Sequence, residues 1–210
     1  MRLVADSVGR QYARRLVVHD VDLSVAPGES VAVTGPSGSG KTTLLAMLGG
    51  LVTPSAGFAG IEHDDGTRTS ASGHAAFVLQ TVNALPRRTV IDNVALGALN
   101  DGLAWGEALA RAHDQLPHVG IAHLAQRPAR SLSGGELQRT VLARALVGTY
   151  PFVLADEPTG QLDRSTTRAV MDTMLSSTRD RGLVVVTHDM EVASMCNRVL
   201  RLDDGRLVPS

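Results

Sequence analysis

The sequence has little of what marks secreted, membrane-spanning or nucleic-acid-binding proteins. Its 210 residues include a single cysteine, Cys196, which has no partner in the chain for a disulfide. The formal net charge is −1, so no excess of positive charge indicates a nucleic-acid partner. The first residues are charged and lack the apolar stretch of a signal peptide. We therefore expect one globular, cytoplasmic domain that binds no nucleic acid.

One uncharged segment, residues 42–61, is nearly long enough to cross a bilayer. Gly49, Gly50 and Pro54 would interrupt a helix there, because glycine weakens a helix interior and proline breaks it. We predict a short buried helix followed by a turn rather than a membrane span.

A glycine-rich segment matches the phosphate-binding pattern G-x-x-x-x-G-K-[ST] at every fixed position. It lies between a β-branched run, residues 30–34, and a helical stretch, residues 42–48, which is the context that this pattern requires. Lys41 can reach the β- and γ-phosphates of a triphosphate, and the Thr42 hydroxyl can bind Mg²⁺. The alternative is a glycine-rich turn with an incidental lysine. The predicted nucleotide-binding residues of this segment are Gly35, Pro36, Ser37, Gly38, Ser39, Gly40, Lys41, Thr42 and Thr43.

Two carboxylates, Asp156 and Glu157, directly follow an apolar run. This run and two others predict buried strands of a parallel sheet, whose carboxyl ends bind ligands in open α/β folds. Because successive residues leaving a strand point to opposite sides, the two carboxylates can have different roles, and Asp156 is placed to hold Mg²⁺. The alternative is that both are solvated caps of the strand. The three predicted strands are residues 75–79, 152–155 and 183–187.

The remaining pattern predicts strands at both ends of the chain and helices in between. The N-terminal segment alternates like antiparallel strands, with apolar runs at residues 16–18 and 21–25, and Asp204-Gly205 has the composition of a hairpin turn. Strands at residues 199–202 and 206–208 would flank that turn. The ranges predicted to be helical are 90–125, 136–147 and 164–179.

The segment Leu132-Ser133-Gly134-Gly135-Glu136 is a second candidate for anion binding. The Ser133 hydroxyl and the N–H groups of the two glycines can form an anion-binding nest at a helix start. The alternative is a helix cap alone, because Ser133 and Glu136 have the spacing of a capping box. The glycine-rich phosphate-binding loop (P-loop) at residues 35–42 already accommodates one triphosphate. The second anion-binding segment therefore has no evident ligand within a single copy of the chain.

With both motifs, the chain resembles the nucleotide-binding subunit of an ATP-binding cassette (ABC) transporter. The resemblance continues through Gln138-Arg139 and the run ADEPTGQLD, and it implies ATP and Mg²⁺ as cofactors. It also implies an α/β fold of the P-loop NTPase class, with a RecA-like core, an N-terminal antiparallel β subdomain and an inserted helical subdomain. Residues 1–210 would form this single nucleotide-binding domain, with the core at about 1–82 and 146–210 and the helical subdomain at about 83–145.

The family pattern gives roles to three further positions. By resemblance, Glu157 is the general base for the attacking water, and His188 is the switch histidine that contacts the γ-phosphate. Gln80 matches the glutamine that joins Mg²⁺ and water to the helical subdomain. A structural histidine and a strand-end glutamine without a task are the alternatives. The predicted catalytic residues are Glu157, His188, Gln80 and Lys41, and the predicted metal-binding residues are Thr42, Gln80 and Asp156.

Three more family features concern the adenine of ATP and a second subunit. Tyr12 lies where the family has an adenine-stacking aromatic, in a chain with only three Phe, two Tyr and one Trp; a core tyrosine is the alternative. Asp163 matches a residue of the dimer interface and can also cap the helix that follows it. The signature residues, which in the family face the ATP of the opposite subunit, are Ser133, Gly134, Gly135 and Glu136.

Taken together, these residues predict an ATP-hydrolysing subunit of a transporter. ATP would bring two copies together, and hydrolysis would drive separate permease subunits in the membrane, with this chain peripheral on its inner face. The runs LGGL at residues 48–51 and ADEPTGQLD most resemble the subfamily of lipoprotein release, macrolide export and antimicrobial-peptide export. The alternative is a mechanical switch for a membrane protein that transports no substrate, as in the cell-division type. The transported substrate is not specified by these residues.

Overall fold

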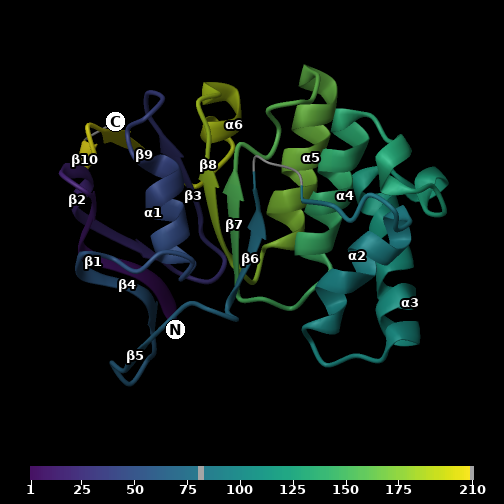
Figure 1. Cartoon of the computed structure of the whole chain (residues 1–210), viewed down its shortest axis with the longest axis horizontal. Coiled ribbons are helices and arrows are strands. Elements are labelled where there is room, and N and C mark those ends of the chain that lie inside the picture. The colour runs from purple at the N-terminus through teal and green to yellow at the C-terminus, as the bar shows by residue number, and fades with distance from the viewer. Residues whose placement is uncertain (80–82, 209–210) are drawn as a thin grey trace. The chain divides into compact units, whose positions relative to one another are not determined.

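The computed structural model describes residues 1–79 and 83–208, and the chain divides into two compact units (Figure 1). The sheet unit comprises Met1–Phe77, Tyr150–Glu157 and Thr178–Ser210, and the helical unit comprises Val78–Thr149 and Pro158–Ser177. The helical unit thus includes a segment that follows Glu157. The predicted subdomain boundaries near residues 83 and 145 stay a prediction.

The sheet unit begins with an antiparallel sheet of four strands in the order β2-β1-β4-β5. Residues 15–25 form one strand, so the two apolar runs predicted near 16–18 and 21–25 belong to the same strand. The alternation of buried and exposed residues along it is typical of a strand with one face in the core. The strands are β1 (Arg2–Tyr12), β2 (Arg15–Val25), β4 (Ala56–Glu62) and β5 (Arg68–Thr69).

The second sheet has six strands in the order β10-β9-β3-β8-β7-β6. Strands β3, β7 and β8 are buried along their whole length and pair in parallel, as their continuous apolar character predicts. The terminal hairpin is also as predicted, with β10 antiparallel to β9 around Asp204-Gly205. The strands are β3 (Ser30–Thr34), β6 (Ala75–Val78), β7 (Phe152–Asp156), β8 (Gly182–Val186), β9 (Arg198–Asp203) and β10 (Arg206–Val208).

Helix α1 (Lys41–Leu48) contacts strands of both sheets and thereby joins them in one core. Its apolar side chains Leu44, Leu45, Met47 and Leu48 are all buried. The predicted short buried helix is therefore confirmed, and the chain turns after it toward β4. In residues 1–79 and 83–208, none of the helices combines the length and apolar character that a membrane span requires. A short helix, α6 (Met190–Ser194), precedes β9.

The helical unit is built from four α-helices and three short 3₁₀ turns among its described residues. The helix predicted over residues 90–125 is interrupted, because Gly102 has a positive φ of 77° and the chain after residue 115 tightens into 3₁₀ turns. The other two predicted helices are present. The elements are α2 (Val90–Leu99), α3 (Trp105–Gln115), η1 (Leu116–Val119), η2 (Ala122–Leu124), η3 (Ala129–Ser131), α4 (Gly134–Leu146) and α5 (Arg164–Ser177).

Close packing of α2 against α4 depends on Gly97. A Cβ atom at this position would lie 1.9 Å from the Arg144 carbonyl oxygen and 2.8 Å from Val147 Cγ1. In contrast, a Cβ atom at Gly106, near the start of α3, would meet nothing within 4 Å. Substitutions at these two glycines therefore distinguish the effect of close helix packing from the effect of helix propensity.

We predict that Gly97→Ala destabilises the protein by about 1–3 kcal/mol, because the added methyl overpacks the contact between α2 and α4. The matched Gly106→Ala should be neutral or stabilise by up to about 1 kcal/mol, since alanine is the better helix former. Urea unfolding followed by circular dichroism measures both changes. Equal effects of the two substitutions would contradict the role assigned to Gly97.

Candidate functional site

The glycine-rich loop joins β3 to α1, as the sequence pattern requires, and its lysine lies over the loop itself. Lys41 Nζ donates to the carbonyl oxygens of Gly35 and Pro36, each at 2.8 Å. The first turn of a helix leaves N–H groups without intrahelical partners, so the start of α1 adds donors beside the lysine. A Cβ atom at Gly38 would meet nothing within 4 Å, which leaves the backbone there open to a ligand. The loop thus presents positive charge and N–H donors to one open region.

Ser39 provides a test of whether a phosphate fits this loop. The residue is only 5% exposed, and its hydroxyl oxygen is buried without a hydrogen-bond partner in the described part of the chain. Buried polar atoms are nearly always paired, so such an atom is an unmet binding capacity. The buried hydroxyl, the Lys41 ammonium and the helix N-terminus form a donor set that suits the anionic oxygens of a phosphate.

Thr42 and Asp156 form a pair of oxygen ligands suited to Mg²⁺. Thr42 Oγ1 donates to Asp156 Oδ2 at 2.8 Å, which joins the start of α1 to the end of β7. Asp156 is 4% exposed, and this burial raises the pKa of its carboxyl group above the ordinary value of 3.8, although the hydrogen bond from Thr42 opposes the shift. A bound divalent cation would compensate the desolvated carboxylate, so hydroxyl and carboxylate oxygens here fit Mg²⁺.

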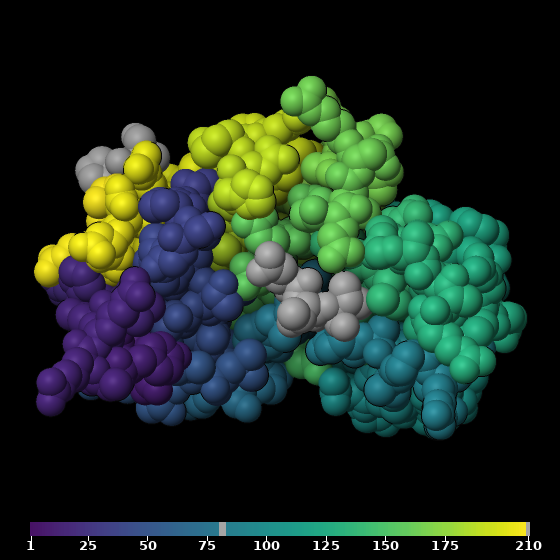
Figure 2. Space-filling view, turned by 45° about the horizontal axis from the view of Figure 1, so that its top comes forward, coloured from purple at the N-terminus to yellow at the C-terminus, as the bar shows by residue number. Residues whose placement is uncertain are grey.

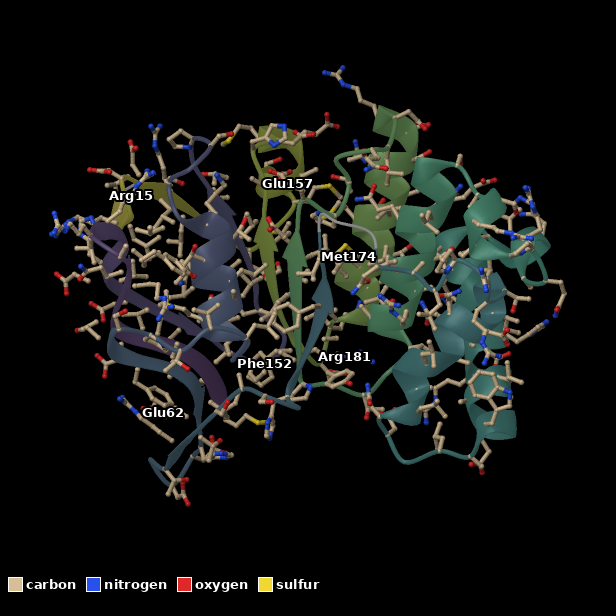
Figure 3. All side chains as sticks on the ribbon, viewed as in Figure 1. Arg15, Glu62, Phe152, Glu157, Met174 and Arg181 are labelled. Carbon is tan, nitrogen blue, oxygen red and sulfur yellow. The ribbon has the colours of Figure 1, made fainter. Side chains whose placement is uncertain are left out.

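Glu157, labelled in Figure 3, directly follows β7 and contacts the segment after β8. Its φ of 49° lies in the left-handed region, which is uncommon outside glycine and clusters at functional sites. Glu157 Oε1 accepts from the His188 backbone N–H at 3.1 Å and lies 2.7 Å from His188 Nδ1. The two neighbouring carboxylates therefore have different partners, as the strand geometry predicts.

The Glu157 carboxylate is held from a second side by Thr187, a contact that sequence reasoning missed. Thr187 Oγ1 donates to Glu157 Oε2 at 3.2 Å and also accepts from the Asp189 backbone N–H at 3.1 Å. The Glu157 side chain is 13% exposed and the His188 side chain 76% exposed, so His188 lies on the solvent side of the pair. In the sequence, Thr187 stands out only as a hydroxyl residue at the end of an apolar strand, and this pattern alone does not indicate a contact with Glu157.

Tyr12 lies at the end of β1 with 43% of its surface exposed, so the alternative of a core tyrosine is wrong. The Arg10 guanidinium carbon lies 4.5 Å from the centroid of the Tyr12 ring, in cation–π geometry. Arg10 is fixed in turn by donating from Nη1 to the Thr53 carbonyl oxygen at 2.9 Å. An arginine holds the Tyr12 ring, which the sequence pattern around Tyr12 did not indicate.

In the helical unit, the signature segment starts α4 with the predicted capping box. The Ser133 hydroxyl and backbone N–H both donate to Glu136 Oε2, at 2.9 and 2.8 Å. The backbone bond and then the hydroxyl bond from Ser133 lower the pKa of the Glu136 carboxyl group. A Cβ atom at Gly134 would lie 2.5 Å from Gln161 Oε1, so this glycine also permits close packing within the same chain. The helix cap is therefore present, and anion binding by the segment stays a prediction.

Asp163 caps helix α5. Its carboxylate accepts from Ser165 Oγ at 2.6 Å, from the Thr166 backbone N–H at 3.0 Å and from Thr166 Oγ1 at 2.7 Å. These hydrogen bonds, led by that from Ser165, lower the pKa of Asp163 far below its usual range. The capping role is thus present, and a place for Asp163 in a dimer interface stays a prediction. Gln80 lies outside the described residues.

A phosphate loop before α1 and an acidic pair at the end of β7 define the class of P-loop nucleoside triphosphatases. A family model described as ABC transporter matches residues 18–160. The lipoprotein-releasing system ATP-binding protein LolD of Pseudomonas syringae pv. tomato is 43% identical over 206 residues, covering 92% of this chain and 89% of that protein. LolD of Bordetella pertussis is 41% identical over 220 residues, covering 99% and 95%.

The fold of this chain is also similar to that of a solved structure along its whole length. A dimeric ATP-binding cassette in a post-hydrolysis state, bound to ADP and Pi, is similar with a TM-score of 0.89 and 31% sequence identity, covering 100% of this chain and 97% of that chain. The chain belongs to the ABC transporter family, as an ATP-binding cassette. The predicted family and fold class are thereby confirmed.

Asp156→Asn tests two properties of the buried carboxyl group separately: its effect on the stability of the fold and its role in binding Mg²⁺. Because folding raises the pKa of the Asp156 carboxyl group, the free energy of unfolding of the protein falls as pH rises from the ordinary pKa of 3.8 through the raised value. The asparagine variant, which lacks this titration, should therefore be more stable than the parent above that window and equal or less stable below it. Urea unfolding of the nucleotide-free protein at several pH values measures the difference.

The same substitution should weaken Mg²⁺-dependent ATP binding about 10- to 100-fold, the usual effect of removing a group that orients a metal. The exposed Asp180→Asn is the matched control and should change neither property. An Asp156→Asn variant that bound Mg²⁺ and ATP like the parent would rule out a metal role for this carboxylate.

Proposed function

We propose that this chain is the ATP-hydrolysing subunit of a transporter that releases lipoproteins from a membrane. The observation that carries the proposal is the placement of Asp156 and Glu157 side by side at the end of β7, one bound to the P-loop threonine and the other to His188. The lipoprotein-releasing relatives, whose alignments cover 92% and 99% of the chain, support the choice of substrate class.

The chemistry follows from the geometry of the sheet unit. The P-loop N–H groups, Lys41 and Ser39 would bind the β- and γ-phosphates, and Thr42 and Asp156 would hold Mg²⁺, whose charge offsets that of the phosphates. The Glu157 carboxylate would accept a proton from the attacking water, while Thr187 fixes its orientation through Oε2. His188 would contact the γ-phosphate from the solvent side. Tyr12, supported on one ring face by Arg10, would stack on adenine with the other.

The signature segment supports a dimer of two copies. Gly134 and Gly135 lie in the first turn of α4, whose N–H groups can bind an anion, and the chain's own P-loop already provides for one triphosphate. Each signature would therefore bind ATP held by the other copy, with Asp163 at the interface. Closure and separation of the dimer would move permease subunits in the membrane, and the chain would lie on the inner, cytoplasmic face beside them.

Replacing Glu157 by Gln tests the assignment of the general base. The amide keeps the shape but cannot accept the proton, so we expect ATP hydrolysis to fall by about 10²-fold or more while ATP binding persists. Steady-state phosphate release and ATP titration measure the two properties. Glu62→Gln, on an exposed ion pair with Arg68, is the matched control and should hydrolyse ATP at the parental rate. Parental hydrolysis by the Glu157 variant would show that another group is the base.

Ser133→Arg tests whether the signature serves a second copy. The long cation would obstruct the start of α4, so we expect dimer-dependent hydrolysis to be lost, while ATP affinity of the monomer changes less than about twofold. Ser176→Arg, on the exposed surface of α5 in the same unit, is the control for added charge and should retain hydrolysis. Light scattering with ATP reports the dimer, and titration at low protein concentration reports the monomer. A large loss of monomer affinity would mean that the segment acts within one chain.

A further inference from the structure

The turn of the C-terminal hairpin lies directly on the P-loop. Asp204 and Gly205, between β9 and β10, have φ values of 43° and 75°, as in the tight turns that join antiparallel strands. The Gly205 backbone N–H donates to the Ser39 carbonyl oxygen at 3.1 Å. Ser39 is the loop residue with the buried, unpartnered hydroxyl, so the turn fixes the backbone at the point where phosphate would bind.

The other side of the turn is held by His19, in β2 of the antiparallel sheet. The His19 backbone N–H donates to the Gly205 carbonyl oxygen at 3.0 Å. Its ring Nε2 lies 2.7 Å from the Asp204 carbonyl oxygen, and because a carbonyl can only accept, Nε2 carries the proton. One imidazole and one backbone N–H therefore connect β2 to a turn that lies 185 residues away along the chain.

Two glycines pack against the same carbonyl group of β2 and complete this junction. A Cβ atom at Gly205 would lie 2.5 Å from the Val17 carbonyl oxygen, and a Cβ atom at Gly40, the last loop residue, would lie 2.7 Å from it. Figure 2 shows the purple N-terminal strands, the blue segment with the loop and α1, and the yellow C-terminal strands against one another. The loop, β2 and the terminal turn thus meet without space for a side chain between them.

We propose that His19 and the Asp204–Gly205 turn are positioning elements that hold the P-loop in its phosphate-binding conformation. The loop needs such support because its glycines have little conformational preference of their own and would lose much entropy on ordering around a ligand. External hydrogen bonds that order the loop beforehand reduce this cost and so raise affinity. The inference rests on the proposed binding of ATP phosphates by the loop, and it assigns His19 no contact with ATP.

Substitution of Gly205 by Ala tests the turn. The methyl collides with Val17 and His19 and should displace the turn from Ser39, so we expect the Kd for ATP with Mg²⁺ to rise about tenfold. Gly66→Ala is the matched control: its φ of 82° is equally strained for alanine, but its Cβ would meet nothing within 4 Å. Isothermal titration with ATP and thermal melting are measured on both variants. A Gly205 variant that melts lower but binds ATP like the parent would overturn the proposal.

A pair of His19 variants tests whether the junction positions the P-loop, even if Gly205→Ala does not fold. The Gln side chain can donate from nearly the position of Nε2, so His19→Gln should keep parental affinity for ATP, whereas His19→Ala should raise the Kd and the KM about five- to tenfold. The value of kcat should stay within about twofold, because the reacting groups are untouched. Equal affinities of the parent and His19→Ala would refute the positioning role.

The same measurements distinguish this inference from the proposed function. If the parent itself fails to bind ATP in the titration, the proposed function is wrong. If the parent binds and hydrolyses ATP while His19→Ala and Gly205→Ala match it in Kd and KM, the function stands and the positioning role is wrong. Higher Kd values for both variants, with parental values for His19→Gln and Gly66→Ala, support both.

Discussion

Burial of helix α1 between the two sheets is the constraint on which the rest of the site depends. Its apolar side chains pack into one core with residues of both sheets, so the direction of its axis is fixed. The N-terminus of α1, with Lys41 and Thr42, is thereby held at the carboxyl ends of the parallel strands. Gly49 shows how tight this packing is, because a Cβ atom there would lie 1.9 Å from Phe77 Cζ and 2.7 Å from Leu154 Cδ1.

The same packing explains why adjacent carboxylates can perform different chemistry. Asp156 is the last residue of a fully buried strand and is desolvated, which suits a group that is neutralised by a bound cation. Glu157 leaves the strand with a left-handed backbone and is anchored by Thr187 and His188. A strained backbone persists only where its surroundings determine it, and here three hydrogen bonds to the carboxylate do so.

In the helical unit, side chains of the motif residues cap the starts of α4 and α5. The glycines of the signature segment permit close approach of Gln161 and Leu162, while Ser133 and Glu136 satisfy the first donors of α4. Asp163 does the same for α5 through Ser165 and Thr166. Residues that a family pattern associates with a partner subunit therefore also stabilise the chain that carries them. Substitutions at these positions need separate measurements of folding and of function.

The sequence by itself determined the elements that depend on local periodicity and on short motifs. The strands β3, β7 and β8, helix α1, the terminal hairpin and the capping box at Ser133 all follow from patterns within a few residues. The long helix predicted over residues 90–125 was wrong in two places, because the chain breaks at Gly102, which has a positive φ, and continues after residue 115 as 3₁₀ turns.

Only the tertiary structure brought together residues that are far apart in sequence. His19 meets Asp204, Arg10 is anchored at Thr53, and Thr42 meets Asp156 through contacts that no local pattern encodes. The physical reason is that hydrogen bonds and packing act over a few ångströms in space, whereas hydrophobic periods and turn signals report only on neighbours along the chain. The sequence therefore identified the phosphate loop, and the fold decided what holds it.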